Sequence, residues 1–351
     1  MDFQNLKKKP IIIAGPCSAE SQDQVTQTAR ALHKTGKVQI FRAGIWKPRT
    51  RPGCFEGVGK KGLPWLEQAK SETGLLTAVE VANPRHVELS LKHNIDILWI
   101  GARTTTSPFA VQEIVESLKG TNYPIMIKNP VNQDLSLWIG AFERFQAASL
   151  NNLCAIHRGF SPGIKGKYRN RPSWEIPLKL REIFPEVPLI CDPSHMGGKR
   201  ELIEQISKEA LELEMNGLMI ETHIKPELAL SDSHQQITPP TLSFILKNLH
   251  SYFLKGHSGK SALDKLRNEI DPIDEELLEI LYKRMNVVHQ IGLTKKKNNI
   301  LPFQKSRMHG LIKNRITKGT ELGLKENYIR EIYQIIHKES VEQQTEIIKS
   351  N

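Results

Sequence analysis

Three cations, Arg42, Lys47 and Arg49, lie close together in a loop that is punctuated by glycine and proline. The loop follows an apolar run at 38–41 that has the length and composition of a β-strand. Parallel α/β sheets bind their ligands beyond the carboxyl ends of the strands, so a strand that leads into a cationic loop is typical of an anion-binding site. A solvated basic loop is the alternative for this segment taken alone.

Chemically active side chains recur just beyond other apolar runs of the chain. Besides Arg42, they are Cys17, Glu80, Arg103, Lys128, Arg158, His195 and Glu221. Burying such groups is costly unless partners converge on them. Cations, carboxylates, a thiol and an imidazole at one edge of a sheet indicate a site for a polyanion with a metal ion beside it.

The elements that must position these residues alternate regularly up to about residue 255. Short apolar runs rich in Ile, Val and Leu each precede a loop or an amphipathic segment; they span residues 10–14, 38–41, 75–79, 97–100, 124–127, 153–156, 188–190 and 217–220. This alternation predicts βα units around a parallel sheet. Eight units in about 250 residues match the size of a (β/α)8 TIM barrel, an α/β fold.

The character of the sequence changes after the last of these units. Residues 256–260 are small and polar and are predicted to form a linker. Beyond them, apolar residues recur at helical spacing, which predicts helices at 261–296, 306–318 and 325–349. The predicted domains are therefore a barrel at 1–255, the linker at 256–260 and an all-α, three-helix domain at 261–351. Three helices are too few to bury both faces, which favours pairing between two copies.

Composition limits the classes of function. No apolar run approaches the ~20 residues that a membrane span needs, and residues 1–9 lack the apolar region of a signal peptide, so a cytoplasmic protein is expected. The four cysteines have no paired spacing and are expected to be reduced thiols. The net charge of +11 is compatible with nucleic-acid binding, but there is no long basic block and no aromatic–basic interleaving. Anionic small substrates explain the surplus at least as well, and we expect neither a nucleic-acid nor a membrane partner.

Five motifs give residues 10–250 a specific resemblance; they are Gly15-Pro16-Cys17-Ser18, Lys47-Pro48-Arg49-Thr50, Gly101-Ala102-Arg103-Thr104, Asp192-Pro193-Ser194-His195 and Leu230-Ser231-Asp232. In this order and spacing, the region resembles a type I-beta 3-deoxy-D-arabino-heptulosonate 7-phosphate (DAHP) synthase. The resemblance implies an aldol-type condensation of phosphoenolpyruvate with erythrose 4-phosphate, at the entry of the shikimate pathway. A related synthase that uses arabinose 5-phosphate is the rival, and the Lys-Pro-Arg-Thr run favours the four-carbon sugar.

The resemblance also implies roles for individual residues of the barrel. Cys17, His195, Glu221 and Asp232 would hold a divalent metal ion, and mixed thiolate, imidazole and carboxylate ligands suit Mn, Fe, Co or Zn. The cations that would hold phosphoenolpyruvate are Arg42, Lys47, Arg103, Lys128 and Arg158. The sugar phosphate would contact Arg49 and Thr50, while Glu80 would orient a cation or a water. The residues expected to be catalytic are Lys47, Lys128 and His195.

Residues 261–350 resemble an all-helical, AroQ-type chorismate mutase. At about 100° per residue, Arg284 and Lys295 lie about 20° apart on one helix face, whereas Arg267 lies about 100° away from Arg284. In that family the corresponding first arginine crosses into the partner's site, which implies a homodimer or a higher homo-oligomer.

Roles in the helical domain also follow from this resemblance. Arg267, Arg284 and Arg307 would bind the two carboxylates of chorismate, Lys295 and Gln344 would bond its ether oxygen, and Ser340 would support a carboxylate. The expected catalytic residues are Arg284, Lys295 and Gln344. Conversion of chorismate to prephenate needs no nucleophile, so restraint and charge stabilisation suffice.

Two positions depart from the best-known mutase pattern. Gln304 and Met308 stand where that pattern has an Asp and a Glu, and the Glu normally bonds the substrate hydroxyl. Gln304 is nevertheless expected to be a substrate-binding residue. The principal hypothesis is a bifunctional enzyme; the alternative is that the mutase domain is mainly a regulatory binding module with weak activity. In either case, prephenate or chorismate bound to the helical domain is predicted to inhibit the synthase.

Overall fold

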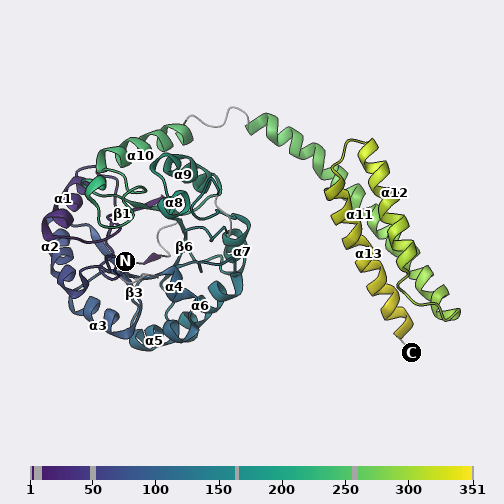
Figure 1. The fold of residues 1–351 in the computed structure, drawn as a ribbon, viewed down its shortest axis with the longest axis horizontal. Helices are drawn as coiled ribbons and strands as arrows, with labels where there is room; N and C mark the ends of the chain where they lie inside the picture. Colours follow the sequence, from purple (N-terminus) through teal and green to yellow (C-terminus); the bar gives the residue numbers. More distant parts are fainter. Residues whose placement is uncertain (1, 4–9, 48–52, 163–165, 255–259, 350–351) are drawn as a thin grey trace. The chain divides into compact units, whose positions relative to one another are not determined.

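The computed structural model describes residues 2–3, 10–47, 53–162, 166–254 and 260–349, without the side chains of 252–254, 260–268 and 305–306. Two compact units divide the chain, Met1–Lys255 and Gly256–Asn351 (Figure 1). The boundary lies in residues 255–259, outside the described ranges, as does most of the predicted linker. None of the described helices has the length and apolar character needed to cross a bilayer.

Parallel strands form the first unit and close into a barrel in sequence order, with β8 paired back to β1. The strands are β1 (Ile11–Gly15), β2 (Ile40–Arg42), β3 (Leu76–Val81), β4 (Ile97–Ile100), β5 (Ile125–Lys128), β6 (Leu153–His157), β7 (Leu189–Cys191) and β8 (Gly217–Glu221). Nearly every strand residue is buried, as expected for parallel strands covered on both faces. The predicted (β/α)8 barrel is confirmed.

Helices surround the strands in a ring, which Figure 1 shows end-on. The longer ones are α1 (Gln22–His33), α2 (Leu63–Thr73), α3 (Pro84–Lys92), α5 (Pro108–Leu118), α6 (Leu135–Ala147), α7 (Glu175–Ile183), α9 (Ile203–Glu212) and α10 (Pro239–Leu254). Short turns of helix, α4 (Ala102–Thr105) and α8 (Pro193–Gly197), follow directly after β4 and β7. At several helix starts a polar side chain, such as that of Ser21 or Asn83, accepts a hydrogen bond from a backbone N–H group of the first turn.

Two apolar clusters hold the barrel together. One fills its interior and includes Phe3, Ile13, Trp99 and Met219. The other lies between the strands and the ring of helices. A close-packed interior of this kind is stiff, so the carboxyl ends of the strands form a rigid platform for side chains.

The second unit contains α11 (Lys260–Lys297), α12 (Lys305–Glu321) and α13 (Glu326–Lys349), and α13 contacts both of the others. These bounds agree with the predicted helices to within about three residues, the uncertainty normal for helix ends. Several large apolar side chains of α11 remain exposed in the single chain, among them Ile273, Leu278 and Val287.

Gly15 allows β1 and β2 to approach closely, and its replacement by alanine is expected to destabilise the barrel. Its φ is +147°, and a Cβ there would lie 2.0 Å from the backbone oxygen of Arg42. Because a strand carbonyl cannot move aside, we expect Gly15→Ala to lower the free energy of unfolding by about 3 kcal/mol or more.

Chemical denaturation measures this effect, with Gly36→Ala as the matched control. Gly36 has a φ of +65° but open space around it, so the control carries only the backbone cost of about 1–2 kcal/mol. Equal destabilisation by the two variants would contradict the steric explanation.

Candidate active site

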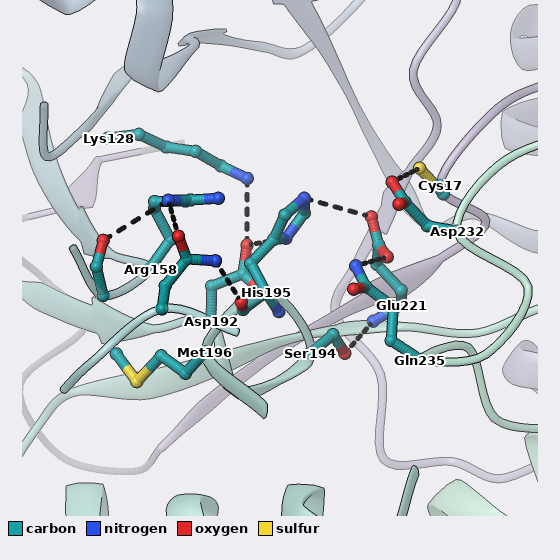
Figure 2. A network of polar contacts seen from close by, with 12 residues as sticks. Cys17, Lys128, Arg158, Asp192, Ser194, His195, Met196, Glu221, Asp232 and Gln235 are labelled. Atoms are coloured by element: carbon teal, nitrogen blue, oxygen red, sulfur yellow. Dashed lines mark hydrogen bonds and ion pairs between the residues drawn. The ribbon is translucent and has the colours of Figure 1, made fainter. Parts of the chain in front are cut away.

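Three predicted metal ligands converge at the carboxyl ends of the strands (Figure 2). Cys17 follows β1, Glu221 ends β8, and Asp232 lies in the loop that follows β8. Their ligand atoms all lie within 4.8 Å of one another, and the Cys17 Sγ is 3.2 Å from the Asp232 Oδ2. Asp232 adopts a φ of +48°, an uncommon backbone conformation of the kind that clusters at functional sites.

His195, the fourth predicted ligand, approaches this cluster from α8. Its Nε2 lies 3.6 Å from the Glu221 Oε1, while its Nδ1 is 2.7 Å from the Asp192 Oδ2. His195 lies outside the set of ligand atoms that are within 4.8 Å of one another. The carboxylate of Asp192 nevertheless fixes the ring so that Nε2 faces Glu221, an arrangement typical of metal-binding histidines.

The chemistry of these donors fits a divalent cation. The Glu221 Oε1 is buried and has no hydrogen-bond partner in the described part of the chain. Burial and the carboxylates of Glu221 and Asp232 raise the pKa of the Cys17 thiol to about 12. A metal ion would offset the repulsion between these groups and bind the thiolate, and the mixed sulfur, nitrogen and oxygen donors suit Mn, Fe, Co or Zn.

Buried cations border the donor cluster. The Arg42 side chain is 1% exposed, lies 3.4 Å from the Glu221 Oε1, and stacks over Trp99. Its Nε and Nη1 atoms are buried and make no hydrogen bond to the described residues. The Lys47 Nζ donates to the Cys17 carbonyl (3.0 Å) and Sγ (3.1 Å). These donors have the geometry to bind an anion beside the cluster.

Lys128 and Arg158 line the same mouth from β5 and from the residue after β6. The Lys128 Nζ lies 2.9 Å from the Asp192 Oδ2, and both groups are buried. The Arg158 Nη1 donates to the Asn170 Oδ1 at 2.8 Å. Burial lowers the pKa of Arg158 to about 10. The nearby cations Arg169 and Arg103 also lower this pKa, whereas the carboxylate of Asp192 raises it. This local excess of positive charge favours a polyanionic ligand.

The remaining predicted barrel residues are less closely grouped. Arg103 lies on α4 and is exposed. Glu80 accepts a hydrogen bond from the Trp99 Nε1 at 3.1 Å. Burial lowers the pKa of Lys47, but the nearby groups of Cys17, Glu80 and Glu221 outweigh burial and raise this pKa. Arg49 and Thr50 lie outside the described residues.

The structure adds residues that the sequence did not single out. The Arg169 Nη1 donates to the Asp232 Oδ1 (2.8 Å) and the Gln235 Oε1 (2.7 Å), and the Gln235 Nε2 donates to the Glu221 Oε2 (2.6 Å). Burial opposes a fall in the pKa of Asp232, but His195 and Arg169 outweigh it and lower that pKa. Arg169 and Gln235 therefore orient two of the candidate ligands.

Asn170 and Asp192 are the other additions. The Asn170 Nδ2 donates to the His195 carbonyl at 2.6 Å, so this amide links His195 to Arg158. Asp192 belongs to a motif recognised in the sequence, but its bonds to both Lys128 and His195 were not anticipated. Arg169 and Asn170 lie in the long segment between β6 and α7, where no periodic pattern marks them.

A second cationic cluster lies in the helical unit. The Arg284 Nη1 donates to the Ser340 Oγ at 2.6 Å, which joins α11 to α13. The Lys295 Nζ donates to the Pro302 carbonyl at 2.7 Å. Gln344 is buried on α13, and its Oε1 has no hydrogen-bond partner among the described residues. Burial lowers the pKa of both Arg284 and Lys295. An anionic ligand would stabilise the charged forms of both side chains.

The other predicted residues of this unit lie near the starts of α11 and α12. Arg307 is exposed near the start of α12, and Gln304 occupies the position just before that helix. The side chain of Arg267 is not among those described.

Two relatives match about two thirds of the chain. A phospho-2-dehydro-3-deoxyheptonate aldolase of Thermotoga maritima is 29% identical over 226 residues, which is 64% of this chain and 64% of that protein. A 2-dehydro-3-deoxyphosphooctonate aldolase of Campylobacter jejuni subsp. doylei is 29% identical over 255 residues, 64% of this chain and 91% of that protein. The chain thus spans just under two thirds of the length of the Thermotoga relative.

Solved structures agree with the fold. The crystal structure of the Thermotoga maritima DAHP synthase is similar with a TM-score of 0.62 and 26% identity, covering 70% of this chain and 69% of that one. A truncated form of 3-deoxy-D-arabino-heptulosonate 7-phosphate synthase from the same organism has a TM-score of 0.60 at 24% identity and covers 70% of this chain and 86% of that one, a likeness of fold.

The family comparison extends over most of the chain. Residues 5–255 match the DAHP synthetase I family, and residues 266–345 match chorismate mutase type II. The first match covers the barrel with its donor cluster, and the second covers the helices with their cationic cluster. The resemblance noted in the sequence is confirmed: the chain belongs to the DAHP synthetase I family and carries a chorismate mutase type II region after its barrel.

Proposed function

We propose that the chain is a bifunctional shikimate-pathway enzyme. Its barrel condenses phosphoenolpyruvate with erythrose 4-phosphate to give DAHP and phosphate, and its helical domain rearranges chorismate to prephenate. The observation that carries the first activity is the convergence of Cys17, Glu221 and Asp232 beside buried cations, in a chain of this family. The domains correspond to residues 1–255 and 261–351, joined by a linker at 256–260.

Phosphoenolpyruvate is held by cations around the barrel mouth. Arg42 has buried N–H groups without hydrogen-bond partners in the described part of the chain. Lys128 and Arg158 point toward the space beside His195 (Figure 2). Arginine forks match the geometry of phosphate and carboxylate groups, and lysine adds a point charge. Lys47 and Arg103 complete the set, and Arg49 and Thr50 bind the sugar phosphate.

A divalent metal ion would be held by Cys17, His195, Glu221 and Asp232. When bound, it supplies Lewis-acid polarisation of the aldehyde oxygen of the sugar. Asp192 keeps the His195 ring turned toward the cluster, while Arg169 and Gln235 fix the carboxylates of Asp232 and Glu221. These bonds pre-organise the site, so no reorganisation is needed during the reaction.

Removal of the metal is expected to abolish the condensation while leaving the mutase reaction intact. Exhaustive chelation should lower phosphate release from the two substrates by at least about a hundredfold, because the developing alkoxide loses its counter-charge. Added Mn²⁺ should restore it. Chorismate consumption by the same sample is the internal control, since the described residues of the helical unit contain no cluster of candidate metal ligands. Full condensation activity in protein shown by elemental analysis to be metal-free would contradict this part of the proposal.

The helical domain acts on chorismate by restraint and charge. Arg284, with Ser340 beside it, binds a carboxylate, and Lys295 with Gln344 bonds the ether oxygen. Arg307, and Arg267 from a second copy of the chain, complete the carboxylate contacts in a homodimer or a higher homo-oligomer. Exposed apolar side chains on α11 support such pairing.

The alternative is a helical domain that mainly binds a regulator and turns over slowly. Gln304 and Met308 favour it, because neither supplies the carboxylate that normally bonds the substrate hydroxyl. Measured chorismate turnover by the full chain distinguishes a working mutase from a binding module.

Prephenate is expected to inhibit the synthase in both cases. The effect requires that prephenate bind one state of the chain more tightly than another, and coupling of this kind typically changes affinity about 5- to 150-fold. Condensation assays at rising prephenate concentration measure it. A synthase that is indifferent to saturating prephenate would remove the regulatory part of the proposal.

A further inference from the structure

His337 lies on the face of α13 that carries the candidate mutase residues. At about 100° per residue, Gln344 is about 20° from His337 around the helix axis and Ser340 is about 60° from it. Ser340 in turn bonds Arg284 of α11. This face of α13 is therefore directed toward the cationic cluster.

The imidazole of His337 is partly buried, and its Nε2 atom is fully buried with no hydrogen-bond partner in the described part of the chain. Its ring centroid lies 6.2 Å from that of Phe303, in the loop whose Pro302 carbonyl accepts from Lys295. An unpaired buried polar atom costs free energy unless a ligand or a water bonds it.

The surroundings of this ring favour its neutral form. Burial lowers the pKa of His337, and the charges of Arg284 and Lys295 lower it further. A neutral imidazole carries one N–H group and one nitrogen lone pair. It can therefore bond an uncharged polar group and adds no further positive charge to the cluster.

Chorismate offers one polar group that the other residues do not take. In the proposed function its two carboxylates and its ether oxygen are bound by the arginines, Lys295, Ser340 and Gln344. The ring hydroxyl remains, because Met308 replaces the usual glutamate and a thioether is only a weak acceptor.

We propose that the His337 Nε2 hydrogen-bonds the ring hydroxyl of chorismate, which makes His337 a substrate-binding residue of the mutase site. This inference rests on the proposed mutase function and names the group that recognises the hydroxyl. The bond orients the ring for the rearrangement, and no proton is transferred because the reaction is pericyclic.

The test combines two protein variants with two ligands, using the full-length chain. His337→Phe removes the nitrogen and keeps a flat ring, whereas His337→Gln retains a hydrogen-bonding group. The ligands are a bicyclic dicarboxylate analogue of the transition state and the same compound without its hydroxyl. Calorimetry should show that His337→Phe weakens the hydroxylated analogue about three- to tenfold and the deoxy analogue less than about twofold, with His337→Gln between wild type and His337→Phe.

His289→Phe is the matched control, because His289 is an exposed histidine on α11, and it should leave both affinities unchanged. Thermal melting shows whether each variant is folded. Equal weakening of both analogues by His337→Phe, or no weakening of either, would overturn the role of His337. Failure of the proposed function looks different, since wild-type protein would then neither consume chorismate nor bind the hydroxylated analogue.

Discussion

Lys128→Met is expected to lower kcat/KM for phosphoenolpyruvate about a hundred- to a thousandfold, the usual cost of removing one pre-organised charge from a reacting site. The Lys128 Nζ is buried beside Asp192 and lies 5.8 Å from the centre of the Trp99 ring, so water cannot replace its charge easily. Methionine keeps much of the volume and removes the ammonium group. Steady-state assays of phosphate release measure the loss.

Stability must be separated from catalysis in this variant. Breaking a buried ion pair can cost about 3–5 kcal/mol, although His195 still bonds Asp192 here. Lys128→Arg keeps the charge and should retain most of the stability, while its wider fork misplaces the charge and lowers activity to an intermediate level. Lys119→Met is the surface control, because Lys119 is 55% exposed in its pair with Glu116 and such pairs contribute little. A folded Lys128→Met variant with wild-type kcat/KM would exclude Lys128 from the site.

Lys295→Ala is expected to lower kcat for chorismate about a hundred- to a thousandfold without affecting the condensation. The Lys295 Nζ donates to the Pro302 carbonyl at 2.7 Å, which fixes the position of its charge. In the proposed function this charge faces the ether oxygen, on which negative charge develops. The decrease in chorismate absorbance measures the mutase reaction. Phosphate release by the same preparation measures the condensation in the barrel.

Lys297→Ala is the matched control for this second prediction, because Lys297 lies one helical half-turn away and is exposed. It should leave both reactions unchanged. Undiminished chorismate consumption by Lys295→Ala would remove Lys295 from the mutase site and would favour a helical domain that only binds its ligand.

The barrel could be predicted from the sequence because its strands are buried on both faces. Such strands appear as short, continuous apolar runs, and a polar residue then marks the end of most runs. Several of these polar residues prove to be the last residues of the strands themselves, namely Arg42, Lys128 and Glu221. The backbone ladder continues for one residue beyond the apolar run, which directs these charges into the mouth of the barrel.

The supporting residues could not be predicted in the same way. Arg169, Asn170 and Gln235 lie in segments whose path depends on tertiary packing, and no periodicity sets them apart from other loop residues. Gly198 illustrates the dependence: a Cβ there would lie 2.5 Å from the Arg169 side chain, so the position of Arg169 depends on a glycine far away in sequence. Contacts of this kind are visible only once the fold is known.

In the helical domain, the helices could be predicted from the sequence, but not every residue of the candidate site. Its helices follow directly from apolar spacing, and the facing of Arg284 and Lys295 follows from helix geometry. His337 carries no such mark, because a lone histidine on a helix is usually a surface or packing residue. What distinguishes it is a buried Nε2 with no hydrogen-bond partner among the described residues, together with the charges of Arg284 and Lys295 that act on the ring.

The central claim is that the barrel joins phosphoenolpyruvate to a four-carbon sugar phosphate, and product analysis tests it most directly. Full-length protein loaded with Mn²⁺ receives phosphoenolpyruvate with either erythrose 4-phosphate or arabinose 5-phosphate, and mass spectrometry identifies the product. The account predicts DAHP and an equal amount of phosphate from erythrose 4-phosphate, and little product from arabinose 5-phosphate. An eight-carbon product from arabinose 5-phosphate alone, or no product from either sugar, would contradict it.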